Sequence, residues 1–157
     1  MDWKVILIAY VLGIVFLICL VWVLIQKQTK AKEQVLNKLN NREEFTPDEF
    51  IKMYKNLIDN KITINSIDQS GCYVFLNKTK NLNYVGQSKN VLKRINQHLN
   101  AKGNGDVYAD LKYGDEFNIF IVKCPENELN VTEKILIEEF NAYTKGYNKN
   151  AGIGRGF

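Results

Sequence analysis

The stretch from Val5 to Ile25 contains no charged residue and is almost wholly apolar. As a helix rising about 1.5 Å per residue it would span roughly 30 Å, the thickness of a bilayer's hydrocarbon core. Trp3 and Trp22 lie towards its ends, where indole rings favour the membrane interface. We therefore expect residues 1–26 to form a single transmembrane anchor. A cleaved signal peptide is the alternative, but its apolar core is typically about 7–15 residues and no small-x-small cleavage site follows.

Lysines are more frequent after this stretch than before it. Lys27, Lys30 and Lys32 follow it closely, whereas only Lys4 and the amino terminus precede it. Because positive residues stay preferentially on the cytoplasmic side, the sequence predicts a single-pass membrane protein whose C-terminal part is cytoplasmic. The formal net charge of +4 permits a nucleic-acid partner without requiring one, and part of it would suit anionic lipid beside the anchor.

Residues 27–69 are expected to link the anchor to the domain that follows. The first part is polar up to Arg42 and carries only a thin apolar stripe, formed by Val35, Leu36 and Leu39. This composition indicates a helical or partly unstructured stalk whose function is spacing. Residues 27–60 also offer a possible contact region for a protein partner.

A helix start follows the stalk. Thr46, Pro47 and Glu49 supply an N-cap, a proline at the first helical position and the acidic member of a capping box. They predict an amphipathic helix over 47–59, which would pack on the next domain or on a partner. Residues 61–70 alternate loosely and are read as a short extended segment.

The three cysteines, Cys19, Cys72 and Cys124, are far apart in the sequence. They form neither a disulfide framework nor a zinc-ligand spacing such as C-x-x-C. Reduced, buried thiols are the expected state.

The stretch from Gly71 to His98 predicts a strand, a turn, a second strand and a helix. Alternation in the first strand places Tyr73 and Phe75 on one face, and in the second strand Tyr84 and Gly86 share a face. If the strands form a hairpin, both tyrosines can point to the same side of the sheet. The alternative is that each tyrosine is a core aromatic whose hydroxyl reaches the rim.

The helix expected over 90–100 has a basic character. Its apolar stripe is formed by Leu92, Ile95 and Leu99, and His98 lies one turn after Arg94. The region from Gln87 to Lys102 contains basic residues and no acidic ones. This pattern fits a helix that faces phosphate, and it also fits a simply solvated helix face.

A buried carboxylate is predicted in the last helix. Residues 117–123 form an apolar run suited to the central strand of a small sheet, and a helix is expected over about 131–143. Glu133 falls in the middle of that helix's apolar stripe, with Leu136, Ile137 and Phe140. A carboxylate there is costly unless it is paired or bound to a metal ion. An ion pair with a lysine or arginine and a metal site both remain open.

These features, taken in order, resemble the GIY-YIG nuclease family. The matching residues are Gly71-Cys72-Tyr73, Tyr84-Val85-Gly86, Arg94, His98, Leu129-Asn130 with Glu133, and Gly146-Tyr147-Asn148. The resemblance implies an α+β domain over residues 70–157, with a small three-stranded antiparallel sheet flanked by helices and preceded by the transmembrane helix. Cys72 departs from the family's isoleucine, but it should face away from Tyr73.

The resemblance also implies a metal-dependent cut in DNA. Glu133 would bind one Mg²⁺ or Mn²⁺ ion, Arg94 would hold the scissile phosphate, and Tyr73 or Tyr84 would help deprotonate the attacking water. His98 matches a histidine found in many members. Asn148, Lys89 and Lys93 are placed on the substrate side, with Asn148 as a supporting residue. Gly71 and Gly86 would have structural roles.

The sequence thus predicts a membrane-anchored, metal-dependent DNA endonuclease. The alternative is a non-catalytic, membrane-tethered module that binds DNA or protein on the same fold. No separate DNA-reading motif is visible, so we expect low sequence specificity or a partner that supplies it.

Overall fold

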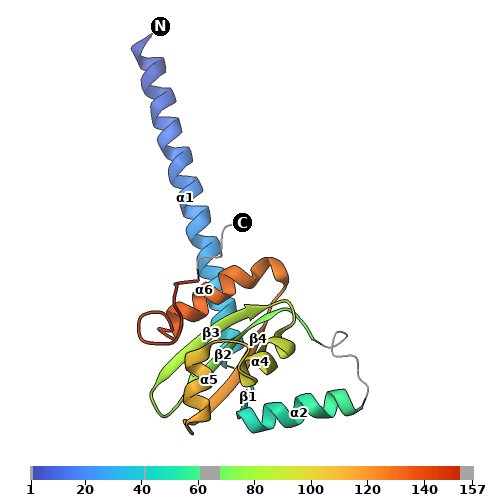
Figure 1. Cartoon of the computed structure of the whole chain (residues 1–157). Coiled ribbons are helices and arrows are strands. Elements are labelled where there is room, and N and C mark those ends of the chain that lie inside the picture. Colours follow the sequence, from blue (N-terminus) through green and yellow to red (C-terminus); the bar gives the residue numbers. More distant parts are fainter. Residues whose placement is uncertain (1, 41, 61–67, 153–157) are drawn as a thin grey trace. The chain divides into compact units, whose positions relative to one another are not determined.

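The computed structural model describes residues 2–40, 42–60 and 68–152. Contacts divide the chain between Gln34 and Val35 into two compact units. The predicted boundaries at residues 26 and 69 remain predictions. The elements are labelled in Figure 1 and run in the order α1 (Trp3–Asn40), β1 (Glu44–Phe45), α2 (Pro47–Asp59), β2 (Gly71–Asn77), β3 (Leu82–Ser88), α4 (Val91–Leu99), α5 (Gly105–Lys112), β4 (Phe117–Lys123), a 3-10 turn (Glu126–Glu128) and α6 (Leu129–Glu139).

Helix α1 includes both the predicted anchor and the predicted stalk. Its apolar part reaches a mean hydropathy of 3.0 over an 18-residue window, and none of that window is buried. Length and composition therefore allow it to cross a membrane, and a signal sequence would have the same features. The stalk is more than a spacer, since Val35 and Leu39 are each 5% exposed and belong to the core of the second unit.

The second unit is built on one antiparallel sheet with the strand order β1-β4-β2-β3. The predicted hairpin and the predicted central strand are present as β2, β3 and β4. The prediction of three strands is wrong by one, because β1 pairs with β4 through Glu44↔Phe120 and Phe45↔Ile119. A two-residue strand has no periodicity that a sequence could reveal. Strand β3 forms one edge of the sheet.

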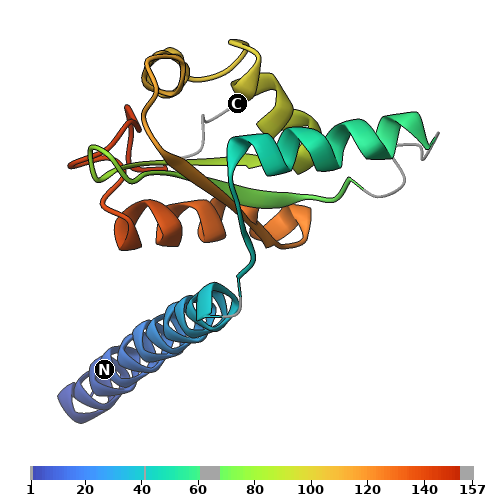
Figure 2. The ribbon, with the colours of Figure 1, turned by 90° about the horizontal axis from the view of Figure 1, so that it is seen from below.

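Helices lie on both faces of the sheet (Figure 2). The two faces carry separate cores, as strand alternation requires. One face packs against α6 and the end of α1. Its buried residues include Cys72, Val74, Val85, Phe120 and Val122. The other face packs against α2, α4 and α5, and its buried residues include Tyr73, Phe75, Phe117 and Ile119.

Helix α2 has the predicted bounds and the predicted start. The Thr46 hydroxyl accepts a hydrogen bond from the Glu49 N–H, and the Glu49 carboxylate accepts one from the Thr46 N–H. Phe50 is fully buried and Tyr54 is 8% exposed, so this face of α2 packs on the domain. Most of the extended segment predicted over 61–70 lies outside the described residues.

The cysteines are free thiols, and Cys72 and Cys124 are buried as expected. Cys19 is exposed, so the expected burial is wrong for that residue. The Cys72 thiol donates to the Leu129 carbonyl on the α6 side of the sheet. It therefore faces away from Tyr73, and the departure from the family's isoleucine leaves the tyrosine face of the strand unchanged.

Candidate active site

The two tyrosines of the hairpin lie on the same face of the sheet. The register pairs Tyr73 with Gly86 and Phe75 with Tyr84, so the tyrosines are diagonal neighbours. Their ring centroids are 6.3 Å apart. A Cβ atom at Gly86 would overlap the Tyr73 hydroxyl, and glycine is therefore the residue that lets the Tyr73 ring lie across β3.

His98 fixes the hydroxyl of Tyr73. The histidine is 1% exposed, and its Nε2 lies 3.0 Å from the Tyr73 hydroxyl oxygen. Its Nδ1 accepts the Asn104 N–H at 3.0 Å. A neutral imidazole with Nδ1 as acceptor carries its proton on Nε2, so His98 donates to Tyr73. Burial, with a smaller effect of the nearby Arg94 guanidinium, lowers the pKa of His98 to about 4 and keeps it neutral near pH 7.

Both tyrosines are poor bases in this environment. Burial is the main cause that raises the pKa of Tyr73, and Tyr84 beside it adds to the rise. Burial also raises the pKa of Tyr84, while Arg94 acts against that rise. Tyr73 is 1% exposed, whereas Tyr84 is only half-buried. Water therefore reaches Tyr84 more readily than Tyr73.

Arg94 lies on α4 with no carboxylate to neutralise it among the described residues. Its Nη1 donates to the Gln97 side-chain oxygen at 3.0 Å and to the Lys102 carbonyl at 3.4 Å. Both partners are uncharged acceptors. A guanidinium held in this way keeps its full charge and can offer paired donors to an oxyanion.

The start of α4 is held by a residue that sequence reasoning missed. The Asp68 carboxylate accepts the N–H groups of Leu92 and Lys93 at 2.8 and 3.0 Å. These are otherwise unpaired donors of the first helical turn, and a carboxylate there also complements the helix dipole. Asp68 precedes the hairpin, so no local capping pattern in the sequence could reveal it.

Glu133 lies at the margin of the buried face of α6 and is half-buried. The fully buried positions of that helix are Leu129, Thr132, Leu136 and Ile137, so the prediction that Glu133 occupies the middle of the stripe is wrong. Its Oε2 accepts a hydrogen bond from Gln87 Nε2 at 2.8 Å. Burial raises the pKa of Glu133, and the bond from Gln87 acts against that rise. No lysine or arginine in the described part of the chain forms the ion pair left open above.

The candidate residues lie on both faces of the sheet, next to the edge strand β3. Tyr73, Tyr84 and His98 lie on the α4 face, whereas Gln87 and Glu133 meet on the α6 face. The two groups are close, since the Glu133 charge adds to the effect of burial on the pKa of Tyr84. Among the described residues no strand pairs with the outer side of β3, although Tyr147 and Asn148 bind the backbone of Asn83 and Val85 there. A ligand at the rest of this edge can contact residues from both faces.

The remaining predicted residues lie around this strand. Asn148 Nδ2 donates to the Val85 carbonyl and Asn148 Oδ1 accepts the Val85 N–H, both at 2.8 Å. Lys89 pairs with Glu126 at 2.6 Å, and both side chains are exposed. Lys93 is exposed on α4. At Gly71, a Cβ would lie 2.9 Å from the Val122 carbonyl oxygen, so that position has little room for a side chain.

The donor set fits a hard divalent cation. Mg²⁺ is typically held by one or two carboxylates and completes its shell with water and substrate phosphate. Glu133 offers such a carboxylate, half-buried and without a cationic partner among the described residues. The same residues contain no cluster of three or more histidine, cysteine or acidic ligands, so a site closed by protein ligands alone is not found in them.

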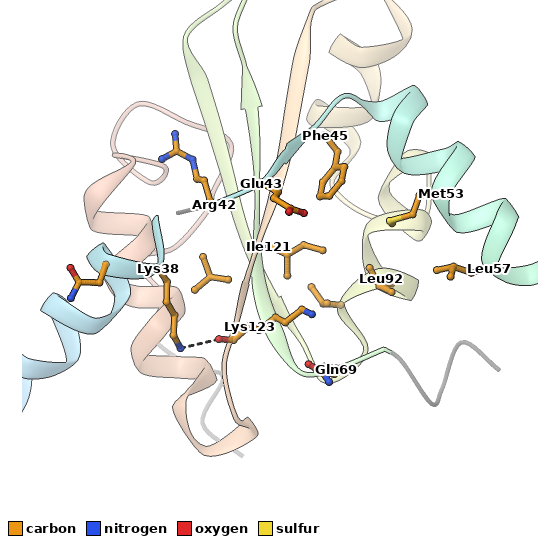
Figure 3. Close-up of a pocket in the computed structure, with 13 residues that line it drawn as sticks. Lys38, Arg42, Glu43, Phe45, Met53, Leu57, Gln69, Leu92, Ile121 and Lys123 are labelled. Carbon is orange, nitrogen blue, oxygen red and sulfur yellow. Dashed lines mark hydrogen bonds between the residues drawn. The ribbon is translucent and has the colours of Figure 1, made fainter. Parts of the chain in front are cut away.

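A cavity of about 780 Å³ lies elsewhere in the second unit (Figure 3). It follows the far side of β4 and is bordered by the end of α1, by α2 and by the start of α4. Figure 3 shows Lys38 donating to the Lys123 carbonyl at its rim, at 2.9 Å. None of the candidate catalytic residues lines it.

Comparison with known proteins identifies the domain. Residues 69–148 match the family model described as "GIY-YIG catalytic domain". The chain belongs to the GIY-YIG family. It therefore carries a GIY-YIG-type endonuclease domain, and the predicted α+β class is confirmed. The match includes every site residue predicted from the sequence, and it leaves Asp68, β1 and α2 outside its limits.

Curated relatives of this GIY-YIG domain share the name UvrABC system protein C. The protein of Mesoplasma florum is 30% identical over 93 residues, which are 58% of this chain and 15% of that protein. The protein of Mycoplasma capricolum is 34% identical over 73 residues, or 46% and 12%. The protein of Methanococcus maripaludis is 31% identical over 81 residues, or 51% and 15%. The chain thus spans only a small part of these relatives, and no solved structure matches it.

Proposed function

We propose that this GIY-YIG protein is a membrane-anchored, metal-dependent endonuclease that hydrolyses DNA phosphodiester bonds. The observation that carries the proposal is that Arg94 on α4 and Glu133 on α6 both act on the pKa of Tyr84, while neither has an oppositely charged partner among the described residues. A half-buried carboxylate without a cationic partner lowers the stability of a folded domain. A metal cation bound by Glu133 and a DNA phosphate bound by Arg94 would neutralise the two charges.

Arg94 is assigned to the scissile phosphate. Its guanidinium offers donors in a planar fork that matches two phosphate oxygens. Negative charge grows on those oxygens as water attacks, and a fixed cation stabilises that charge more in the transition state than before it. Lys89 and Lys93 would contact neighbouring phosphates. The exposed pair of Lys89 with Glu126 is worth about 0–1 kcal/mol, so Lys89 can exchange it for DNA.

Glu133 is assigned as the ligand of one Mg²⁺ or Mn²⁺ ion. When bound, such an ion would neutralise phosphate charge and make the attacking water easier to deprotonate. Gln87 occupies Oε2 of the carboxylate. The other oxygen, Oε1, is the one assigned to the ion.

The tyrosines are assigned to positioning and deprotonating the water. His98 donates to the Tyr73 oxygen, which leaves the hydroxyl proton of Tyr73 free to point towards the site. The half-buried Tyr84 is the tyrosine that solvent reaches. A phenol with a raised pKa is a weak base at neutral pH, so proton transfer needs a nearby cation that lowers this pKa. Arg94 already lowers the pKa of both Tyr73 and Tyr84, against the effect of burial. Asn148 is assigned a supporting role, since both polar ends of its amide bind the Val85 backbone.

The test uses the full chain purified in detergent and incubated with plasmid DNA and Mg²⁺ or Mn²⁺. Glu133→Gln and Arg94→Ala should each lower the nicking rate by about 10²–10³-fold, the cost typical of losing one group that stabilises the transition state. Glu139→Gln is the matched control, because it removes an exposed carboxylate from the end of the same helix. DNA binding without cleavage by the wild type, with either metal, would instead favour the non-catalytic binding module.

The anchor is part of the proposal and has its own test. The support is the apolar part of α1 and the lysines that follow it, which favour a cytoplasmic catalytic domain. The intact mass of protein extracted from membranes distinguishes a retained anchor from a cleaved signal peptide. Protection of the domain from protease added outside sealed cells reports its side of the membrane. Cleavage of the domain under those conditions would refute the proposed orientation.

A further inference from the structure

We propose that Gln87 is a positioning residue that holds the Glu133 carboxylate in the orientation required to bind the divalent cation. This inference rests on the proposed function, in which Glu133 is the metal ligand. Gln87 immediately follows the Tyr84-Val85-Gly86 motif, and the sequence pattern gave it no role.

The geometry connects the edge strand to the first turns of α6. Gln87 is paired with Cys72 across the hairpin, and its side chain points to the α6 face. Its Nε2 lies 2.8 Å from Glu133 Oε2 and 2.8 Å from Asn130 Oδ1. An amide nitrogen carries two hydrogens, so both bonds form at the same time. Asn130 and Glu133 are three residues apart on α6, where side chains are neighbours.

The chemistry of the donor suits this role. A lysine or arginine at this place would neutralise Glu133 and compete with a bound cation. The amide of Gln87 holds one carboxylate oxygen and adds no net charge, so the carboxylate keeps its attraction for the cation. Residues that orient a metal ligand in this way typically change metal affinity or activity by about 10–100-fold when they are replaced.

The experiment measures Mn²⁺ binding to the full chain in detergent, without DNA, by the enhancement of water-proton relaxation. Gln87→Leu and Gln87→Met both remove the donor while keeping a similar volume, and two variants guard against a fold defect in one of them. Each should weaken Mn²⁺ binding by about 10-fold or more. Their thermal unfolding midpoints should stay close to that of the wild type.

Asn130→Ala is the matched control. It removes the second acceptor of Gln87 and leaves the bond to Glu133, so Mn²⁺ affinity should change by less than about 2-fold. In the nicking assay, the Gln87 variants should need about 10-fold more Mn²⁺ for half-maximal rate and regain most of the rate at saturation. A defect of the fold alone would lower the rate at every metal concentration.

The outcomes separate this inference from the function on which it rests. If the wild type binds Mn²⁺ no better than Glu133→Gln, the proposed metal ligand is wrong. If Glu133→Gln loses binding while both Gln87 variants bind like the wild type, the role of Gln87 is overturned and the metal ligand stands. If Asn130→Ala weakens binding as much as Gln87→Leu, the bond to Glu133 is not what positions the carboxylate, and the inference also fails.

Discussion

Lowering the pH should destabilise the catalytic domain through one residue, His98. Its pKa is about 4 in the folded chain, against 6.5 for an ordinary histidine. Below pH 6.5 the unfolded chain therefore binds a proton that the folded chain rejects. The stability that neutral His98 contributes is complete above that pH and is lost as the pH falls towards 4. Between pH 7 and pH 4.5 we expect a loss of about 2–3 kcal/mol from this residue alone.

The assay benefits from His98 being the only histidine in the chain. One imidazole signal in a proton NMR titration of the full chain in detergent reports its pKa directly. Unfolding by urea, followed by the near-UV circular dichroism of the tyrosines, gives the free energy of unfolding at each pH. His98→Gln is the control, because an amide can still donate to Tyr73 and accept from Asn104 but does not titrate.

The control is needed because carboxylates titrate in the same range. Glu133 acts with the opposite sign: burial raises its pKa, so its contribution to stability is lost as the pH rises. The quantity to compare is the difference between the wild type and His98→Gln. An imidazole that titrates near 6.5, or equal slopes of stability against pH in the two proteins, would refute the buried neutral histidine and the direction assigned to its bond with Tyr73.

Three further predictions test the supports of the site. Gly86→Ala should force the buried Tyr73 ring to move, which should cost about 1–3 kcal/mol of stability and most of the nicking activity. Gly105→Ala is the control, because a Cβ at that position meets open space. Equal melting midpoints for the two variants would contradict the argument. Asp68→Ala should remove two hydrogen bonds from the start of α4 and cost about 1 kcal/mol in urea unfolding. A chain that starts at residue 43 loses the buried Val35 and Leu39 and should be less stable than one that starts at residue 27, by about 1.5–3 kcal/mol for each side chain.

Local patterns in the sequence predicted the parts of the fold that local rules control. Alternation placed Tyr73 and Phe75 on one face of β2, and the structure confirms this. The capping residues Thr46 and Glu49 fixed the start of α2 at Pro47. Helix α4 was expected over 90–100 and runs over Val91–Leu99. In each case the determining residues lie within a few positions of one another.

Other predictions failed where the ends or faces of helices depend on tertiary packing. The last helix was expected over 131–143 but runs over Leu129–Glu139, and Asn141 after it has φ of 50°. Gly146, the first glycine after this helix, lies beyond its end, and a Cβ there would overlap the Asn83 carbonyl oxygen. His98 was expected along the same side as Arg94, but it is buried while Arg94 is half-exposed. Residues at i and i+4 can differ in burial in this way when they lie at the border of a helix's buried face.

The contacts that organise the site could not be predicted because they join distant parts of the chain. Gln87 reaches Glu133, Asp68 reaches the start of α4, and Asn148 reaches the Val85 backbone. A polar side chain in a strand or loop carries no periodic signal that names its partner. The family motif located the residues, and only the packed sheet decides which of them touch.

The position of β3 at the edge of the sheet explains how so short a motif can serve both faces. Successive side chains of a strand alternate, so Tyr84 and Gly86 face α4 while Val85 and Gln87 face α6. In a central strand these two sets would be separated by a neighbouring strand, and no single phosphate could meet both. An edge also exposes unpaired backbone groups that invite pairing with other chains. The two hydrogen bonds from Asn148 satisfy such groups at Val85, and the Tyr147 N–H satisfies the Asn83 carbonyl, so this segment protects the edge of β3 next to the tyrosine that solvent reaches.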